Sequence, residues 1–322
     1  MNKWGAPGDR GSADKEMKAK QKAYLYLILT MVIWGSMYVF CKYVFVVMPP
    51  LVLLFLRYLI GTGVLYLLWR RGPREKIRKE DRKYILAIGG VGYFAGIGFQ
   101  LVGTELCSAS LASLINSMNP VVIVLLAMVV LRERATVKKL AAIGVTIVGT
   151  VVIVGQIEGG SVFWGALISV ASVLCWSLGS VFVRFISDRY GTLTITTSAM
   201  AVATVLSLPV CILELTRTPL AWAEAGFMFY FSFLYICIVS TVISFLTWSR
   251  ALALADAATC SLFYPIQPLV SALMGIFILK EVITLNFLVG AAFIVAGILF
   301  SVLVESAGRE EALPEKAAGQ RE

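Results

Sequence analysis

The chain consists of long apolar segments joined by short polar connections. Ten segments of about 20 residues can be distinguished, at 24–45, 49–69, 84–103, 108–131, 140–157, 162–183, 192–214, 227–248, 258–279 and 285–304. About 20 apolar residues in a helix cross the hydrocarbon core of a bilayer, so the pattern predicts ten transmembrane helices. The polar ends, 1–22 and 305–322, are predicted as tails, the first of them disordered. The connections are too short to hold a folded domain outside the membrane.

Composition supports an all-α integral membrane protein. Hydrophobic residues make up 59% and charged residues 15% of the 322 residues, whereas soluble domains carry about 25% charged residues. The chain contains no histidine, which excludes catalytic triads and histidine metal sites. The six cysteines form no CxxC pair and are interpreted as packing residues. We therefore expect no metal, no cofactor and no enzymatic activity.

The basic residues predict the orientation in the membrane. Six Lys and Arg residues lie in 1–22 and eight in 70–83, and both regions are cytoplasmic if the amino terminus is inside. Only Lys42, Arg217 and Lys280 then fall outside. Because Lys and Arg near span ends are retained in the cytoplasm, we expect a multi-pass inner-membrane protein with both termini cytoplasmic. The net charge of +9 is explained by this topology, so no nucleic-acid partner is expected.

The chain carries an internal repeat. At an offset of 142 residues Trp34 matches Trp176, and at an offset of 148 LRERAT (131–136) matches LKEVIT (279–284). We assign 23–157 and 158–304 as two five-helix repeats. Five is odd, so the second repeat enters the membrane from the opposite face, and inverted repeats are typical of transporters that work by alternating access.

These motifs resemble a known family. IWGSMYVF in the first span, ASLASLINSMNPVVIVLLA in the fourth and LAAIGVTIVGTVVIV in the fifth are similar to the drug/metabolite transporter superfamily, in its EamA-type branch. The second half repeats them as VLCWSLGSVFVRF, ATCSLFYPIQPLVSAL and LVGAAFIVAGILF. The resemblance covers 24–304 and implies ten helices and transport of a metabolite. It does not specify the substrate.

Polar and aromatic side chains inside the spans are the candidates for solute binding. Amides in hydrocarbon must find partners, so they are expected to face the bundle interior. Tryptophans at mid-depth either line a cavity or fill the bundle, and the amides either bind solute or bond neighbouring helices. The predicted substrate-binding residues are Trp34, Tyr38, Arg57, Tyr93, Gln100, Asn116, Asn119, Trp176, Ser180, Tyr264 and Gln267.

Arg57 lies well inside the second span. A charge at that depth is costly unless it is paired or hydrated. Two interpretations stay open. Arg57 forms a structural ion pair, for example with Glu105, or it attracts anions in an outward vestibule together with Lys42.

A second set of residues is predicted to gate access. Glu133 and Glu281 end the fourth and ninth spans on opposite faces, where each could pair with basic neighbours. Prolines within spans weaken the helix and free backbone carbonyl groups. The predicted gating residues are Lys42, Pro120, Glu133, Arg184, Pro268 and Glu281.

These features predict a carrier for a small organic solute, amino-acid-like or aromatic, with efflux preferred. No carboxylate lies in the middle of a span, so facilitated diffusion or exchange is expected rather than proton antiport. A membrane-embedded enzyme acting on a lipid-linked substrate is the alternative, and it would need interfacial carboxylates or a nucleophile with a base. A channel would need a continuous polar lining. The partners are the solute and the lipid bilayer, and the protein is expected as a monomer or homodimer.

Overall fold

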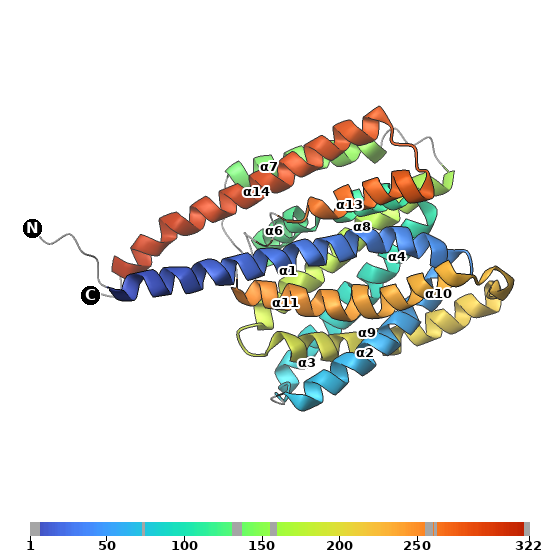
Figure 1. The fold of residues 1–322 in the computed structure, drawn as a ribbon, viewed down its shortest axis with the longest axis horizontal. Coiled ribbons are helices and arrows are strands. Elements are labelled where there is room, and N and C mark those ends of the chain that lie inside the picture. The colour runs from blue at the N-terminus through green and yellow to red at the C-terminus, as the bar shows by residue number, and fades with distance from the viewer. Residues whose placement is uncertain are drawn as a thin grey trace, which may run out of the picture.

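The computed structural model describes residues 7–72, 75–130, 137–154, 160–254, 260 and 263–318, and these residues form helices without strands. In the first half the helices are α1 (Pro7–Phe45), α2 (Pro50–Arg71), η1 (Lys79–Asp81), α3 (Arg82–Ala87), η2 (Ile88–Ile97), α4 (Gly98–Leu106), α5 (Ala109–Asn116), α6 (Asn119–Val130) and α7 (Val137–Val154). In the second half they are α8 (Gly160–Ile186), α9 (Thr192–Arg217), η3 (Trp222–Glu224), α10 (Phe227–Leu234), η4 (Tyr235–Ile243), α11 (Ser244–Leu254), α13 (Ile266–Met274), η5 (Gly275–Leu279) and α14 (Leu285–Ala318). Figure 1 shows them as a layered bundle.

The helices account for the predicted spans. Within the described residues, seven helical stretches are long and apolar enough to cross a membrane, and three shorter apolar helices bring the number to ten. The third span is continuous from Lys79 to Leu106 although it passes through η1, α3, η2 and α4. The prediction of an all-α membrane bundle is confirmed.

The two ends of the chain differ from the prediction. α1 begins at Pro7 and α14 continues to Ala318, so residues 7–22 are helical and not a disordered tail. Residues 14–22 are mainly Lys, Glu, Met, Ala and Gln, which favour helix. Extending an existing helix also requires no new nucleation. We call the face that carries Pro7 and Ala318 the terminal face, and the face with the connections 46–49 and 107–108 the distal face.

Two helix pairs show how the halves are arranged. In the first pair, Thr30 of α1 bonds Thr247 of α11 at 2.7 Å, and further along α1 the Trp34 Nε1 donates to Ser244 Oγ at 2.9 Å. Residue numbers rise on one helix while they fall on the other, so α1 and α11 are antiparallel.

The second pair joins the third span to α8. A Cβ atom added to Gly92 would lie 2.9 Å from the Cα of Gly179, and one added to Gly103 would lie 2.3 Å from Ser169 Oγ. The third span and α8 are therefore antiparallel as well. The repeat matches α1 to α8 and the third span to the η4–α11 span, so the two pairs are equivalent, and each joins the first span of one half to the third span of the other.

The remaining long pairs join each helix to its own counterpart. Thr62 of α2 bonds Thr204 of α9, while Trp69 of α2 donates to Thr194 of α9. α7 and α14 are also antiparallel and run side by side along one edge of the bundle (Figure 1). A two-fold relation between inverted repeats places counterpart helices antiparallel to one another, which is the arrangement found here.

Candidate functional site

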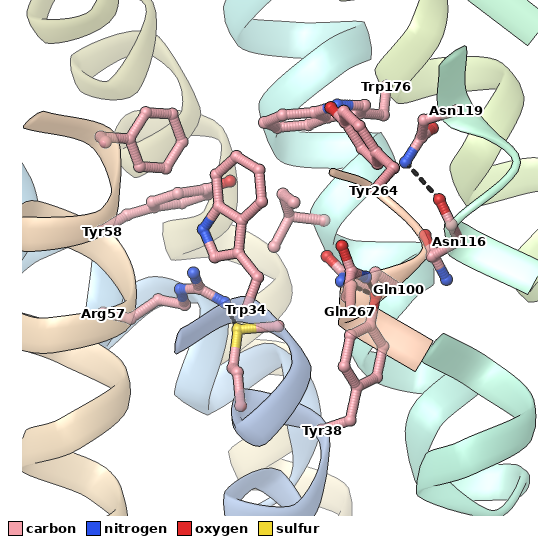
Figure 2. A pocket seen from close by; sticks show the side chains of 13 residues that line it. Trp34, Tyr38, Arg57, Tyr58, Gln100, Asn116, Asn119, Trp176, Tyr264 and Gln267 are labelled. Carbon is pink, nitrogen blue, oxygen red and sulfur yellow. Dashed lines mark hydrogen bonds between the residues drawn. The ribbon is translucent and has the colours of Figure 1, made fainter. Parts of the chain in front are cut away.

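A cavity lies where the two halves meet (Figure 2). Its volume is about 50 Å³, which is enough for a few water molecules. Nine of the eleven predicted substrate-binding residues are in its lining, which consists of Trp34, Met37, Tyr38, Arg57, Tyr58, Ile97, Gln100, Asn116, Asn119, Trp176, Phe245, Tyr264 and Gln267. Small-molecule pockets usually exceed about 300 Å³, so a solute of ten or more atoms requires the helices to separate.

Aromatic rings form one wall of the cavity. Phe245 lies between the two predicted tryptophans, with ring centroids 6.2 Å from Trp34 and 6.4 Å from Trp176, both edge to face. Tyr93 stacks on Trp176 at 5.6 Å. The tryptophans therefore belong to one aromatic cluster built from both halves, and this cluster offers ring faces and edges to an apolar group.

A hydrogen-bonded group of three side chains lines the cavity. Gln100 Nε2 donates to Tyr38 Oη at 2.5 Å, and Gln267 Nε2 donates to the same oxygen at 3.2 Å. Tyr38 is fully buried. Figure 2 shows these three side chains together, to the right of Trp34. We call Tyr38, Gln100 and Gln267 the Tyr38 group, and it joins α1, α4 and α13.

The two asparagines line the cavity and also bond to α8. Ser172 Oγ donates to Asn116 Oδ1 at 3.1 Å, and Ser177 Oγ donates to Asn119 Oδ1 at 3.2 Å. Asn119 Nδ2 donates to the Asn116 carbonyl oxygen at 2.6 Å (Figure 2). Pro120 cannot donate to that carbonyl group, so the Asn119 side chain takes the place of the missing donor.

Both prolines lie in the first turn of a helix. The fourth span is broken between Asn116 and Asn119, and Pro120 follows at the start of α6. Pro268 likewise lies at the start of α13. The predicted kink is therefore a break in the helix beside the cavity.

Arg57 is buried, with 3% of its surface exposed, and it lines the cavity. Its Nε donates to Thr241 Oγ1 at 3.2 Å and one terminal nitrogen lies 3.6 Å from Met37 Sδ. Arg57 and Glu105 form no ion pair in the part of the chain that the structure describes. Glu105 is exposed on α4, so the proposed pairing with Glu105 is wrong.

Two predicted binding residues lie outside the lining. Tyr93 is behind Trp176, where its carbonyl oxygen accepts from Tyr58 Oη at 2.9 Å. Ser180 Oγ donates to the Trp176 carbonyl oxygen of its own helix. Tyr93 therefore supports the cluster from outside, and Ser180 bonds only within α8 among the contacts described here.

Four lining residues were missed by the sequence analysis: Met37, Tyr58, Ile97 and Phe245. The repeat offers one signal for two of them, because the offset of 148 places Ile97 opposite Phe245. Ile97 also lies four residues after Tyr93 on the same helical face. The structure itself marks this region. π-helical turns occur at η2 and η4, which are equivalent positions of the two repeats, and such turns are frequent at functional sites.

The predicted gating residues on the distal face, Lys42 and Glu281, both bond to the segment 105–110. The Glu281 carboxylate accepts from the backbone N–H groups of Ala109 at 2.6 Å and Ser110 at 3.2 Å, and from the Ser110 hydroxyl at 2.5 Å. Lys42 donates to the carbonyl oxygens of Glu105 and Cys107. We call Lys42, Ser110 and Glu281 the distal latch, because they join α1, α5 and the end of the ninth span.

The predicted gate on the terminal face is described only in part. Glu133 lies outside the described residues, and Arg184 is exposed in the last turn of α8. A different contact joins the halves there: Asp81, which is 1% exposed, accepts from Arg189 and from the Tyr190 hydroxyl, each at 2.7 Å.

Opening of the distal latch should be visible through Cys107. This thiol is 3% exposed and lies between two spans, and burial raises its pKa to about 12 although Lys42 opposes the shift. The closed protein should therefore react very slowly with a membrane-impermeant maleimide at pH 8, because the thiolate is the reactive form. Glu281→Ala should raise the labelling rate at least about 10-fold. A Cys107→Ser, Glu281→Ala variant gives the background, and equal rates with and without Glu281 would contradict a closing role for the latch.

Comparison with known proteins decides the family. The sequence model of the EamA-like transporter family matches this chain twice, over residues 21–155 and 163–303. The chain belongs to the EamA-like transporter family. The resemblance found in the sequence is thereby confirmed, and each match corresponds to one half of the bundle.

Several relatives align with this EamA-like transporter over nearly their whole length. Two uncharacterized transporters from Archaeoglobus fulgidus are each 25% identical, covering 87% and 86% of this chain and 99% and 96% of their own. The uncharacterized inner membrane transporter YicL of Salmonella typhimurium is 23% identical, covering 88% of this chain and 96% of its own. A protein of known crystal structure, 23% identical, matches with a TM-score of 0.62 over 88% of this chain and 97% of its own, and it has the same fold. The protein is a multi-pass membrane transporter.

Proposed function

We propose that this EamA-like transporter carries a small organic solute, amino-acid-like or aromatic, out of the cell by alternating access. The repeats 23–157 and 158–304 are the units that move, in an inner membrane with both termini cytoplasmic. The observation that carries this proposal is the position of the cavity, which is lined by Trp34 of one half and Trp176 of the other. A site between inverted repeats becomes accessible to either face when one repeat rocks against the other.

The contacts between the cavity and the distal connections support a closed distal face. The Tyr38 group and then the distal latch lie between the cavity and the distal connections. Separating these contacts and forming equivalent ones on the terminal face would expose the same cavity to the other side. Because the cavity closes within one chain, a monomer suffices.

An enzyme is less well supported by the lining. None of its thirteen residues is Asp, Glu, Ser or Cys, so it holds neither a pair of carboxylates nor a nucleophile beside a base. A channel is less well supported because the lining is not continuously polar: Trp34, Trp176 and Phe245 interrupt it.

Overproduction in cells tests the proposal. Untargeted mass spectrometry of medium and cytoplasm should find a compound class that leaves the cell with the wild-type protein and not with the Trp34→Ala, Trp176→Ala double variant. A compound that leaves equally with both proteins would contradict transport through the cavity.

A further inference from the structure

Arg57 has hydrogen-bonding capacity that the protein leaves unused. A guanidinium group carries five N–H donors. Two of them have partners in the described structure, the Thr241 hydroxyl and the weak acceptor Met37 Sδ, which leaves three. In Figure 2 the guanidinium group points toward Trp34 at the side of the cavity.

The surroundings do not neutralise this charge. The lining contains one cation, Arg57, and no carboxylate, and the polar neighbours are neutral tyrosine, glutamine and asparagine side chains. A buried charge is costly unless an opposite charge or water compensates it. The Tyr58 ring lies 5.9 Å from the guanidinium carbon, but the described contacts provide neither a protein carboxylate nor a full set of hydrogen-bond acceptors, so the cavity is suited to an anion.

The other lining residues indicate what the anion is attached to. Trp34, Trp176 and Phe245 present an aromatic wall within the same cavity. A guanidinium group binds a planar carboxylate through two parallel hydrogen bonds. No acidic side chain in the lining is available for an ammonium group, which disfavours zwitterions and cations.

We infer that the solute is an aromatic carboxylate with a net negative charge, whose carboxylate binds Arg57 and whose ring packs against the tryptophan cluster. This inference rests on the proposed function and narrows its substrate class. It favours anions such as arylalkanoates over amino acids.

The charge of the solute also supplies a driving force. Moving one negative charge out of a cell with a negative interior is favoured by the membrane potential, equivalent to about a 50-fold concentration ratio per 100 mV. Efflux of an organic anion therefore needs no proton-coupling carboxylate. This agrees with a cavity lining that contains no acid.

Binding to the purified wild-type protein tests the charge preference without a variant. The probes share one ring and chain length and differ in charge: 3-phenylpropionate, its neutral amide 3-phenylpropionamide, phenylalanine and phenethylamine. Charge-assisted hydrogen bonds predict that the carboxylate binds at least about 10-fold tighter than the amide. Equal affinity for carboxylate and amide, or tighter binding of phenylalanine or phenethylamine, would overturn the inference.

Arg57→Gln and Arg57→Lys test the residue. Arg57→Gln should remove the preference for carboxylate over amide, and Arg57→Lys should keep part of it because the charge remains. If Arg57→Gln does not fold, the comparison of Arg57→Lys with wild type still decides, since an unchanged carboxylate preference and affinity would exclude a bidentate contact.

Proteoliposomes separate this inference from the proposed function. With a potassium-diffusion potential, 3-phenylpropionate should leave the negative compartment faster than after collapse of the potential, relative to liposomes without protein. Potential-independent transport of phenylalanine would overturn the inference and leave the carrier function standing. Selective binding of the carboxylate without transport of any probe would count against the carrier and support the binding site.

Discussion

Replacing Gly179 with valine is expected to prevent stable assembly of the bundle. A Cβ atom at this position would lie 2.6 Å from the Cα of Gly92, and backbone cannot move aside as a flexible side chain can. The third span and α8 would have to separate along their length, at a cost of about 3 kcal/mol, the upper end of what overpacking usually costs. The measurement is the apparent melting temperature in detergent together with the amount of protein in the membrane.

Gly63→Val is the matched control. Gly63 also lies in a long helix, but no atom is within 4 Å of its added Cβ. Each variant replaces a helical glycine with the same β-branched side chain. Equal melting temperatures for the two variants would show that the Gly92–Gly179 contact does not hold the halves together.

Removing both tryptophans of the cavity is expected to reduce transport at least about 10-fold while the protein still folds. Trp34 and Trp176 each contribute a ring to the cluster around Phe245, and each aromatic contact is worth about 0.5–1.5 kcal/mol beyond the buried area. The comparison is initial rates for the double alanine variant and the wild type at equal protein in proteoliposomes.

Trp164→Ala provides the control for this variant. Trp164 lies on α8 like Trp176 but is 61% exposed and does not line the cavity. It should transport at the wild-type rate. A loss of folding in the double variant would instead indicate that the tryptophans only fill the bundle.

The sequence predicts the bundle well because its signals are strong and repeated. Twenty-residue apolar segments are required by the thickness of the bilayer, and the match of Trp34 with Trp176 reveals the two halves. The helical extension at Pro7–Lys22 was not predicted, because charged residues in water can form helix or coil and only their continuity with α1 favours the helix.

The cavity could be predicted through its polar members and the two tryptophans that the repeat relates. Gln100, Asn116 and Gln267 are costly in hydrocarbon, and this cost forces them inward. Phe245 and Ile97 have no such signature, since apolar residues lie equally well against lipid or in a cavity. The sequence also could not show that Arg57 and Glu105 do not pair, because this depends on which side of α4 faces α2.

The proposed alternating access requires the distal latch and the terminal face to open in turn. Spin labels can report this at two pairs of exposed positions, Val46 with Val282 on the distal face and Lys22 with Ser187 on the terminal face. Pulsed electron spin resonance then measures both distances in proteins with and without Gly275→Ala. The added methyl group would lie 2.6 Å from Glu281 Oε2 and 2.7 Å from Ser110 Oγ, and so would displace the latch. We predict that the substitution lengthens the distal distance and shortens the terminal one, and distances that both stay fixed, or both lengthen, would contradict alternating access.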